Sequence, residues 1–199
     1  MKNTLLAIAL ATASLPLIPA ISHADDNTSN GAGGFFVNGN VGQSNLDKGL
    51  YNDNDTGAGV NAGYRWALSP NVALGLEGGY TDLGKFDTKS SFDDLGLGRA
   101  SVKGWTAGVN GHFNINPQWY VSARAGLFNG EVKGFAADTS DTGFHYVDDS
   151  ATKYYAGAGF GYDFSNNFSV GLNYDYYKAK TDGLNLDPGL VSVSAEYRF

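Results

Sequence analysis

The sequence predicts an all-β protein in which eight strands close into an antiparallel up-and-down transmembrane β-barrel. The 199 residues include 28 Gly, 12 Tyr and 12 Phe, and a chain rich in glycine and aromatic residues favours strands over helices. Eight segments alternate apolar and polar residues with a period of two, which is the periodicity of a strand. The connections between them alternate between short and long, which is typical of barrels that cross a membrane.

The eight predicted strands share one pattern. One face carries large apolar or aromatic residues, and the other carries Gly, Asn, Ser and a few charges. They span about 35–42, 58–66, 72–80, 104–113, 119–127, 154–164, 168–176 and 191–199. These lengths are close to the roughly 9–11 residues that a tilted strand needs to cross a bilayer. In a soluble sandwich or lipocalin-like barrel, which is the alternative, the polar face would meet water and would be richer in Lys and Glu.

The connections set the orientation of the predicted barrel. Three are short and rich in turn residues, at 67–71, 114–118 and 165–167. The other four are long and acidic, at about 44–57, 81–100, 131–151 and 179–189. Short periplasmic turns and long external loops are the expected arrangement. Aromatic residues on the apolar face support it, because most gather at the short-turn ends and a looser upper belt contains Tyr80, Trp105, Tyr154, Tyr174 and Tyr176.

The N-terminus predicts an export signal. Lys2 precedes an apolar stretch from Leu5 to Ile18, and Ser22-His23-Ala24 places small residues at a cleavage site. We therefore predict a signal peptide at 1–24, a disordered leader at 25–34 and the barrel at 35–199, with export through the Sec pathway. The alternative, a membrane-anchoring helix, would need roughly 20 apolar residues, and this stretch is shorter and contains proline.

Charge and composition argue against several classes of function. The formal net charge of −7 disfavours nucleic-acid binding, which needs a basic surface. The chain has no Cys, so no disulfide scaffold or thiolate chemistry is expected. The acidic run Asn52–Asp55 lacks the glycine and the distal glutamate of an EF-hand loop and is interpreted as a solvated loop. We expect no cofactor, no metal site and no enzymatic activity.

The inward face carries two predicted charge clusters. Glu77 and Arg124 are expected to pair, with Asp175 as a possible third member, because an unpaired charge in a narrow interior is costly. A second cluster is expected near the periplasmic mouth, formed by Arg65, His112, Asp163, Glu196 and Arg198. Two interpretations stay open: the clusters satisfy buried charge, or they gate a channel. The many inward glycines predict water-filled space between them.

The ordered motifs resemble the eight-stranded transmembrane domain of the OmpA family, with OmpX-like barrels as architectural relatives. The resemblance covers nearly all of the mature chain. It is carried by 57–64, by 76–84, by 123–126 and by the ending Glu196-Tyr197-Arg198-Phe199. It implies an integral protein of the Gram-negative outer membrane. It also implies that Glu77 and Arg124 belong to a salt-bridge network that blocks or gates a narrow channel. The family's inward lysine falls at Asn110, and a further arginine and glutamate fall at Gly171 and Asn173, so the other partners of that network are absent.

The C-terminal strand resembles the signal by which the barrel-assembly machinery recognises its substrates. The signal residues are Val193, Ala195, Tyr197 and the terminal Phe199. Because the chain stops there, we do not expect the family's peptidoglycan-binding domain.

Two hypotheses for the function are consistent with these expectations. The leading hypothesis is a structural and surface-interaction barrel that supports envelope integrity and displays its loops to an unknown external ligand. The alternative is a narrow gated channel for ions or small solutes. Lys103 and Lys178 lie on the outward face at the upper rim and are candidates to contact the phosphates of lipopolysaccharide. Ordinary surface lysines are the other interpretation.

Overall fold

The computed structural model describes residues 33–48, 51–86, 100–137, 144–181 and 184–199. The predicted signal peptide and most of the predicted leader lie outside these residues. None of the described residues forms a helix long and apolar enough to cross a membrane. The first strand begins at Gly34, one residue before the predicted start of the barrel.

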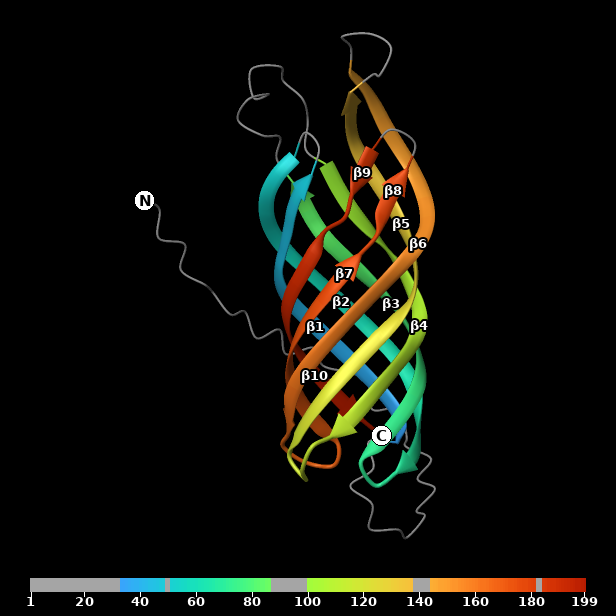
Figure 1. Cartoon of the computed structure of the whole chain (residues 1–199), viewed down its shortest axis with the longest axis vertical. Coiled ribbons are helices and arrows are strands. Elements are labelled where there is room, and N and C mark those ends of the chain that lie inside the picture. Colours follow the sequence, from blue (N-terminus) through green and yellow to red (C-terminus); the bar gives the residue numbers. More distant parts are fainter. Residues whose placement is uncertain (1–32, 49–50, 87–99, 138–143, 182–183) are drawn as a thin grey trace, which may run out of the picture.

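Eight of the ten strands in the described part of the chain form one closed antiparallel barrel, which confirms the predicted fold class. Neighbouring strands are consecutive around the barrel, except that the first strand pairs with the last and closes it. Figure 1 shows the strands tilted around a common axis, with the C-terminus at the end that carries the short turns. The barrel strands are β1 (Gly34–Lys48), β2 (Tyr51–Ser69), β3 (Val72–Phe86), β4 (Ala100–Asn114), β5 (Trp119–Ala137), β6 (Phe144–Asp163), β7 (Phe168–Tyr177) and β10 (Gly189–Arg198).

All eight strands are longer than predicted, six of them by at least five residues. β2 and β5 have 19 residues each and β6 has 20, so much of the predicted loops at 44–57 and 131–151 is paired strand. The β1–β2 ladder continues to Lys48 opposite Tyr51. The fourth predicted loop contains a small separate hairpin of β8 (Ala179–Thr181) and β9 (Leu184–Leu186). Periodicity missed these extensions because a hairpin that leaves the bilayer no longer needs one apolar face.

The outward face carries a band of large exposed apolar side chains. Leu76, Val109 and Leu127 are each more than half exposed. In water such a continuous band would be a large unfavourable surface, whereas lipid chains cover it without cost. Edge-to-face aromatic pairs flank the band at the short-turn end, for example Tyr64 with Trp66 at 5.1 Å between ring centroids.

The upper part of the interior is filled by an apolar layer that sequence reasoning missed. Its nine buried members contact one another as one cluster and come from seven strands: Leu46, Leu83, Phe86, Ala100, Val102, Phe128, Tyr155, Tyr177 and Leu190. Four of them, Leu46, Leu83, Phe86 and Ala100, fall in segments that were predicted to be loops. The inward phase of the strands continues into these segments, so their apolar residues point into the barrel.

The inward glycines leave little of the water-filled space that was predicted. The cavity inside the barrel measures only about 40 Å³, which is room for a few water molecules at most. Large neighbours occupy the space instead. A Cβ atom at Gly157 would collide with the Asp175 carboxylate, and one at Gly161 would lie 2.5 Å from the Tyr120 hydroxyl. Glycine at these positions is what allows the larger side chains to fill the interior.

Candidate functional site: the polar interior

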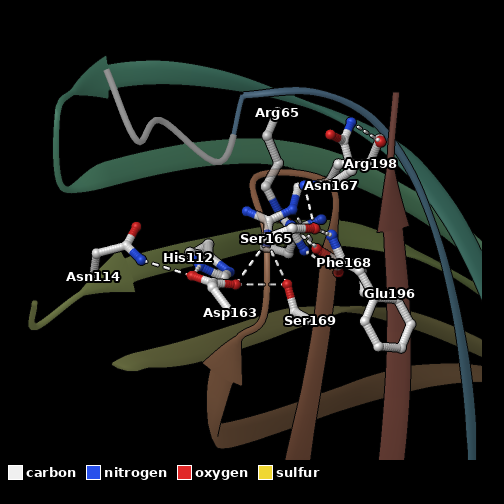
Figure 2. Close-up of polar contacts among 11 residues, drawn as sticks. Arg65, His112, Asn114, Asp163, Ser165, Asn167, Phe168, Ser169, Glu196 and Arg198 are labelled. Atoms are coloured by element: carbon white, nitrogen blue, oxygen red, sulfur yellow. Dashed lines mark hydrogen bonds and ion pairs between the residues drawn. The ribbon is translucent and has the colours of Figure 1, made fainter. Parts of the chain in front are cut away.

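The charged residues of the lower barrel form a compact cluster at the mouth that faces the short turns (Figure 2). Arg65 of β2 and Glu196 of β10 make two parallel hydrogen bonds, Nη1 to Oε1 at 2.6 Å and Nη2 to Oε2 at 2.9 Å. Both side chains are at least 93% buried. The bidentate geometry is the strongest arrangement for an arginine with a carboxylate. The Arg65 guanidinium also lies 4.0 Å from the centre of the Phe36 ring.

The other residues of the mouth cluster gather around the carboxylate of Asp163. Arg198 Nη2 lies 2.6 Å from its Oδ1 atom, and His112 Nε2 lies 3.3 Å from its Oδ2 atom. Asn114 and Ser169 donate two further hydrogen bonds to the same carboxylate. Arg198 Nε approaches Glu196 Oε1 at 3.7 Å and thereby joins the two halves. The structure therefore brings together all five residues of the predicted mouth cluster.

The mouth cluster holds a serine, a histidine and an aspartate, but not in the order that nucleophilic catalysis uses. In a catalytic triad the serine hydroxyl contacts the imidazole and the aspartate orients the imidazole from its other side. Here Ser169 and His112 both contact Asp163, on different oxygen atoms. Ser169 is fully buried and also contacts Arg198, and His112 stacks on Tyr120 at 4.0 Å between ring centroids. These contacts neutralise a buried carboxylate.

Arg124 lies at mid-height in the barrel and pairs mainly with Asp175. Its Nε atom donates to Asp175 Oδ1, and its Nη2 atom lies beside Oδ2, both at 2.6 Å. Glu77 Oε1 is farther away, at 3.9 Å from Arg124 Nη1. The order of partners thus differs from the prediction, in which Glu77 was the principal partner and Asp175 a possible third. The register explains the difference, because Arg124 and Asp175 flank Gly157 in one row across β5, β6 and β7.

Glu77 has neutral hydrogen-bond donors as its close partners. The Tyr155 hydroxyl donates to Oε1 at 2.7 Å, and Asn110 Nδ2 donates to Oε2 at 3.1 Å. The Asn110 amide oxygen in turn accepts a hydrogen bond from Arg65 Nε at 2.6 Å. Asn110 therefore joins the two predicted clusters into one network. Sequence reasoning noted that a charge was missing at this position and missed the bridge, which needs both a donor and an acceptor.

The two rim lysines have different surroundings. Lys178 Nζ lies 3.1 Å from the fully buried carboxylate of Asp187, and the hydrogen bond that it donates raises the pKa of the lysine. Lys103 Nζ lies 4.0 Å from Glu131 Oε2, while Lys133 occupies Glu131 Oε1 at 2.7 Å. Lys103 therefore has the looser ionic partner.

Three of the predicted assembly-signal residues lie on the outward face of β10, and Phe199 directly follows this strand. Val193, Tyr197 and Phe199 are each about half exposed, and Ala195 is exposed beside them. The rings of Tyr197 and Phe199 meet edge to face with their centroids 5.0 Å apart. These side chains therefore face the lipid in the closed barrel.

Among the described residues, no group of three or more His, Cys, Asp or Glu is placed to hold a metal ion. The acidic run Asn52–Asp55, predicted to be a loop, is part of β2. The carboxylate of Asp55 accepts hydrogen bonds from the backbone N–H groups of Thr56 and Lys85, both at 2.7 Å.

A closed eight-stranded barrel with an apolar belt outside and a paired polar network inside defines the class of small integral membrane barrels. Residues 5–199 match the family described as "Outer membrane protein beta-barrel domain". The chain belongs to this family and is an integral β-barrel protein of the Gram-negative outer membrane.

Solved structures with the same fold include two surface proteins. The chain is 21% identical to Ail, the attachment invasion locus protein of Yersinia pestis, with a TM-score of 0.56, covering 84% of this chain and 99% of Ail. It is 16% identical to Neisserial surface protein A, with a TM-score of 0.53, covering 83% and 97% of the two chains. Ail has also been solved in complex with the heparin analogue sucrose octasulfate; that structure is 20% identical, with a TM-score of 0.55, and the match covers 84% and 99%. No curated protein matches the chain. At these identities the likeness shows a shared fold.

Proposed function

We propose that this protein is a closed barrel with a structural and surface-interaction role, which supports the envelope and displays its extracellular hairpins to external partners. The apolar layer in the upper interior is the observation that carries the proposal. Seven of its nine residues have no accessible surface, and Tyr155 and Leu46 are at most 2% exposed. A solute would have to displace this layer to cross the barrel.

Energetics favour a closed barrel over the alternative of a narrow channel. The polar network rises from the mouth to Glu77 and Arg124 and then meets Tyr155 and Tyr177, which are stacked with ring centroids 5.9 Å apart. Above them the lining is apolar. An ion in such a layer would lose its hydration without gaining partners, and hydrophobic constrictions stop conduction by excluding water. The charge pairs below the layer are interpreted as satisfied buried charge.

The composition of the extracellular segments indicates what kind of partner suits them. The four segments at 44–57, 81–100, 131–151 and 179–189 contain 14 acidic and 6 basic residues. Ail is an attachment protein that was solved with a polyanion, so surface binding has a precedent on this fold. The acidic hairpins of this chain favour a cationic partner surface instead, by charge complementarity.

Two envelope partners belong to the same proposal. The assembly machinery would bind the outward face of β10 through Phe199 before the barrel closes. Lipopolysaccharide phosphates would contact the upper rim, mainly at Lys103, because Lys178 already has Asp187 as a close partner.

Single-channel recording in a planar bilayer tests the closed barrel directly. Heat-modifiable migration on a gel would first establish that the inserted protein is folded. We expect a silent bilayer from the folded protein. Reproducible conductance steps that change in Glu77→Gln or Arg124→Gln variants would overturn the proposal and make transport the leading function.

A further inference from the structure

An outward groove lies at the top of the lipid-facing band and runs across the four neighbouring strands from β3 to β6. Its lining includes Tyr80, Lys103, Trp105, Asn129, Glu131 and Ser150, and its volume is about 420 Å³. We call it the belt groove. Ligand sites for small molecules commonly measure roughly 300–1,000 Å³. The backbone of Gly104 also lines it, between the outward side chains of Lys103 and Trp105.

The lower side of the belt groove is an aromatic platform. Trp105 is 66% exposed, and Tyr80 packs against it edge to face at 5.1 Å between ring centroids. This contact holds the indole in place while leaving it accessible. The face of an indole ring carries negative charge density and attracts groups with polarised hydrogens. The C–H face of a sugar ring is such a group, and lipid acyl chains are not.

Polar and charged side chains complete the lining of the belt groove. Asn129 is held by a hydrogen bond to Thr152 at 2.9 Å, so its amide is kept at the groove. Glu131 is bound closely by Lys133, and the Lys103 ammonium is 4.0 Å from the other oxygen of that carboxylate. Lys103 can therefore turn its N–H groups towards an anion without breaking a short ion pair. Ammonium–phosphate hydrogen bonds are among the strong polar contacts.

We propose that the belt groove binds the phosphorylated sugar head group of a membrane glycolipid, with Trp105 beneath the sugar ring and Lys103 on the phosphate. The proposal rests on the lipopolysaccharide contact suggested above for Lys103 and adds a sugar-binding platform to it. The place of the groove on the barrel favours a lipid as its ligand. Its lining residues face outward where the exposed apolar band ends, so the head groups of membrane lipids lie beside it. An ordinary anionic phospholipid offers a phosphate to Lys103 but no ring to Trp105.

Native mass spectrometry of the detergent-solubilised protein tests the belt groove. The probes are a phosphorylated diglucosamine lipid, the same lipid without phosphate, and phosphatidylglycerol. Trp105→Ala and Lys103→Gln remove the platform and the cation. Trp66→Ala removes a second lipid-facing indole, 51% exposed, at the other end of the barrel, and Lys178→Gln removes the rim lysine that Asp187 already binds. Heat-modifiable migration verifies the fold of each variant.

We expect the wild type to retain the phosphorylated sugar lipid about tenfold better than either other lipid, and Trp105→Ala and Lys103→Gln to lose that preference. The two control variants should keep it. Equal retention of phosphatidylglycerol, or unchanged preference in a folded Lys103→Gln protein, would overturn the proposal. Conductance recordings on the same preparations are independent of this outcome, so loss of the lipid site and failure of the closed-barrel proposal can be told apart.

Discussion

Asn110 donates a hydrogen bond to Glu77 Oε2 at 3.1 Å, and this bond links the charges at mid-barrel to those at the mouth that faces the short turns. The other end of the amide accepts from Arg65 at 2.6 Å. Four strands, β2, β3, β4 and β10, are thereby connected through Asn110, Arg65, Glu77 and Glu196. A lysine at position 110 could donate to Glu77 but could not accept from Arg65. The asparagine is thus suited to a fixed connection between the two halves of the interior.

Asn110→Ala should lower the free energy of unfolding by about 1–3 kcal/mol, because it leaves a buried arginine N–H and a carboxylate oxygen without partners. The measurement is urea-induced unfolding in detergent, followed by tryptophan fluorescence. Asn173→Ala is the matched control, since the Asn173 side-chain amide donates to the neutral Ser194 hydroxyl at 2.8 Å. Equal losses in the two variants would contradict the bridging role of Asn110.

Asp175→Asn should destabilise the barrel more than Glu77→Gln. Asp175 makes two 2.6 Å contacts with Arg124, and neutralising it leaves a buried guanidinium without its main counter-charge. Breaking a buried pair in this way costs about 3–5 kcal/mol. Glu77→Gln keeps an oxygen for the Tyr155 hydroxyl and should cost less. Urea unfolding of both variants under one set of conditions decides the order, and a larger loss for Glu77→Gln would restore the pairing predicted from sequence.

The strand count and the closed antiparallel order could be predicted from the sequence because lipid and a filled interior make opposite demands on alternate residues. That rule predicts from the sequence alone that Leu76 faces the lipid and that Glu77 faces the interior. It does not say which inward charges meet. Arg124 and Asp175 share a row across Gly157, and that row depends on the stagger between strands, which alternation does not encode.

The apolar layer was unpredictable for a related reason. Leu83 and Ala100 lie in an acidic, turn-rich stretch of sequence at 81–100, where only a few inward positions are apolar and the outward ones are polar. Such a pattern is typical of a loop when it is considered alone. The register carries their side chains inward only because the strands of β3 and β4 continue past the membrane band.

Phe128→Ala should cost about 3–5 kcal/mol of unfolding free energy, because it opens a cavity in a fully buried layer. Phe160→Ala is the matched control: Phe160 is 46% exposed on the lipid side, where lipid can fill the vacated space. Urea unfolding compares the two. If the losses are equal, the layer is not packed as a core, and the closed-barrel proposal loses its main support.

The acidic extracellular segments predict that this protein will not bind sucrose octasulfate, the polyanion with which Ail was solved. With 14 acidic and 6 basic residues in those segments, a sulfated ligand meets like charge. Isothermal titration of the protein in nanodiscs should give no heat with sucrose octasulfate. Polylysine should bind, with an affinity that falls as salt is raised, because screening weakens contacts between exposed charges. Salt-sensitive binding of the sulfated sugar would instead place a basic site on the extracellular surface and overturn the proposed preference for cationic partners.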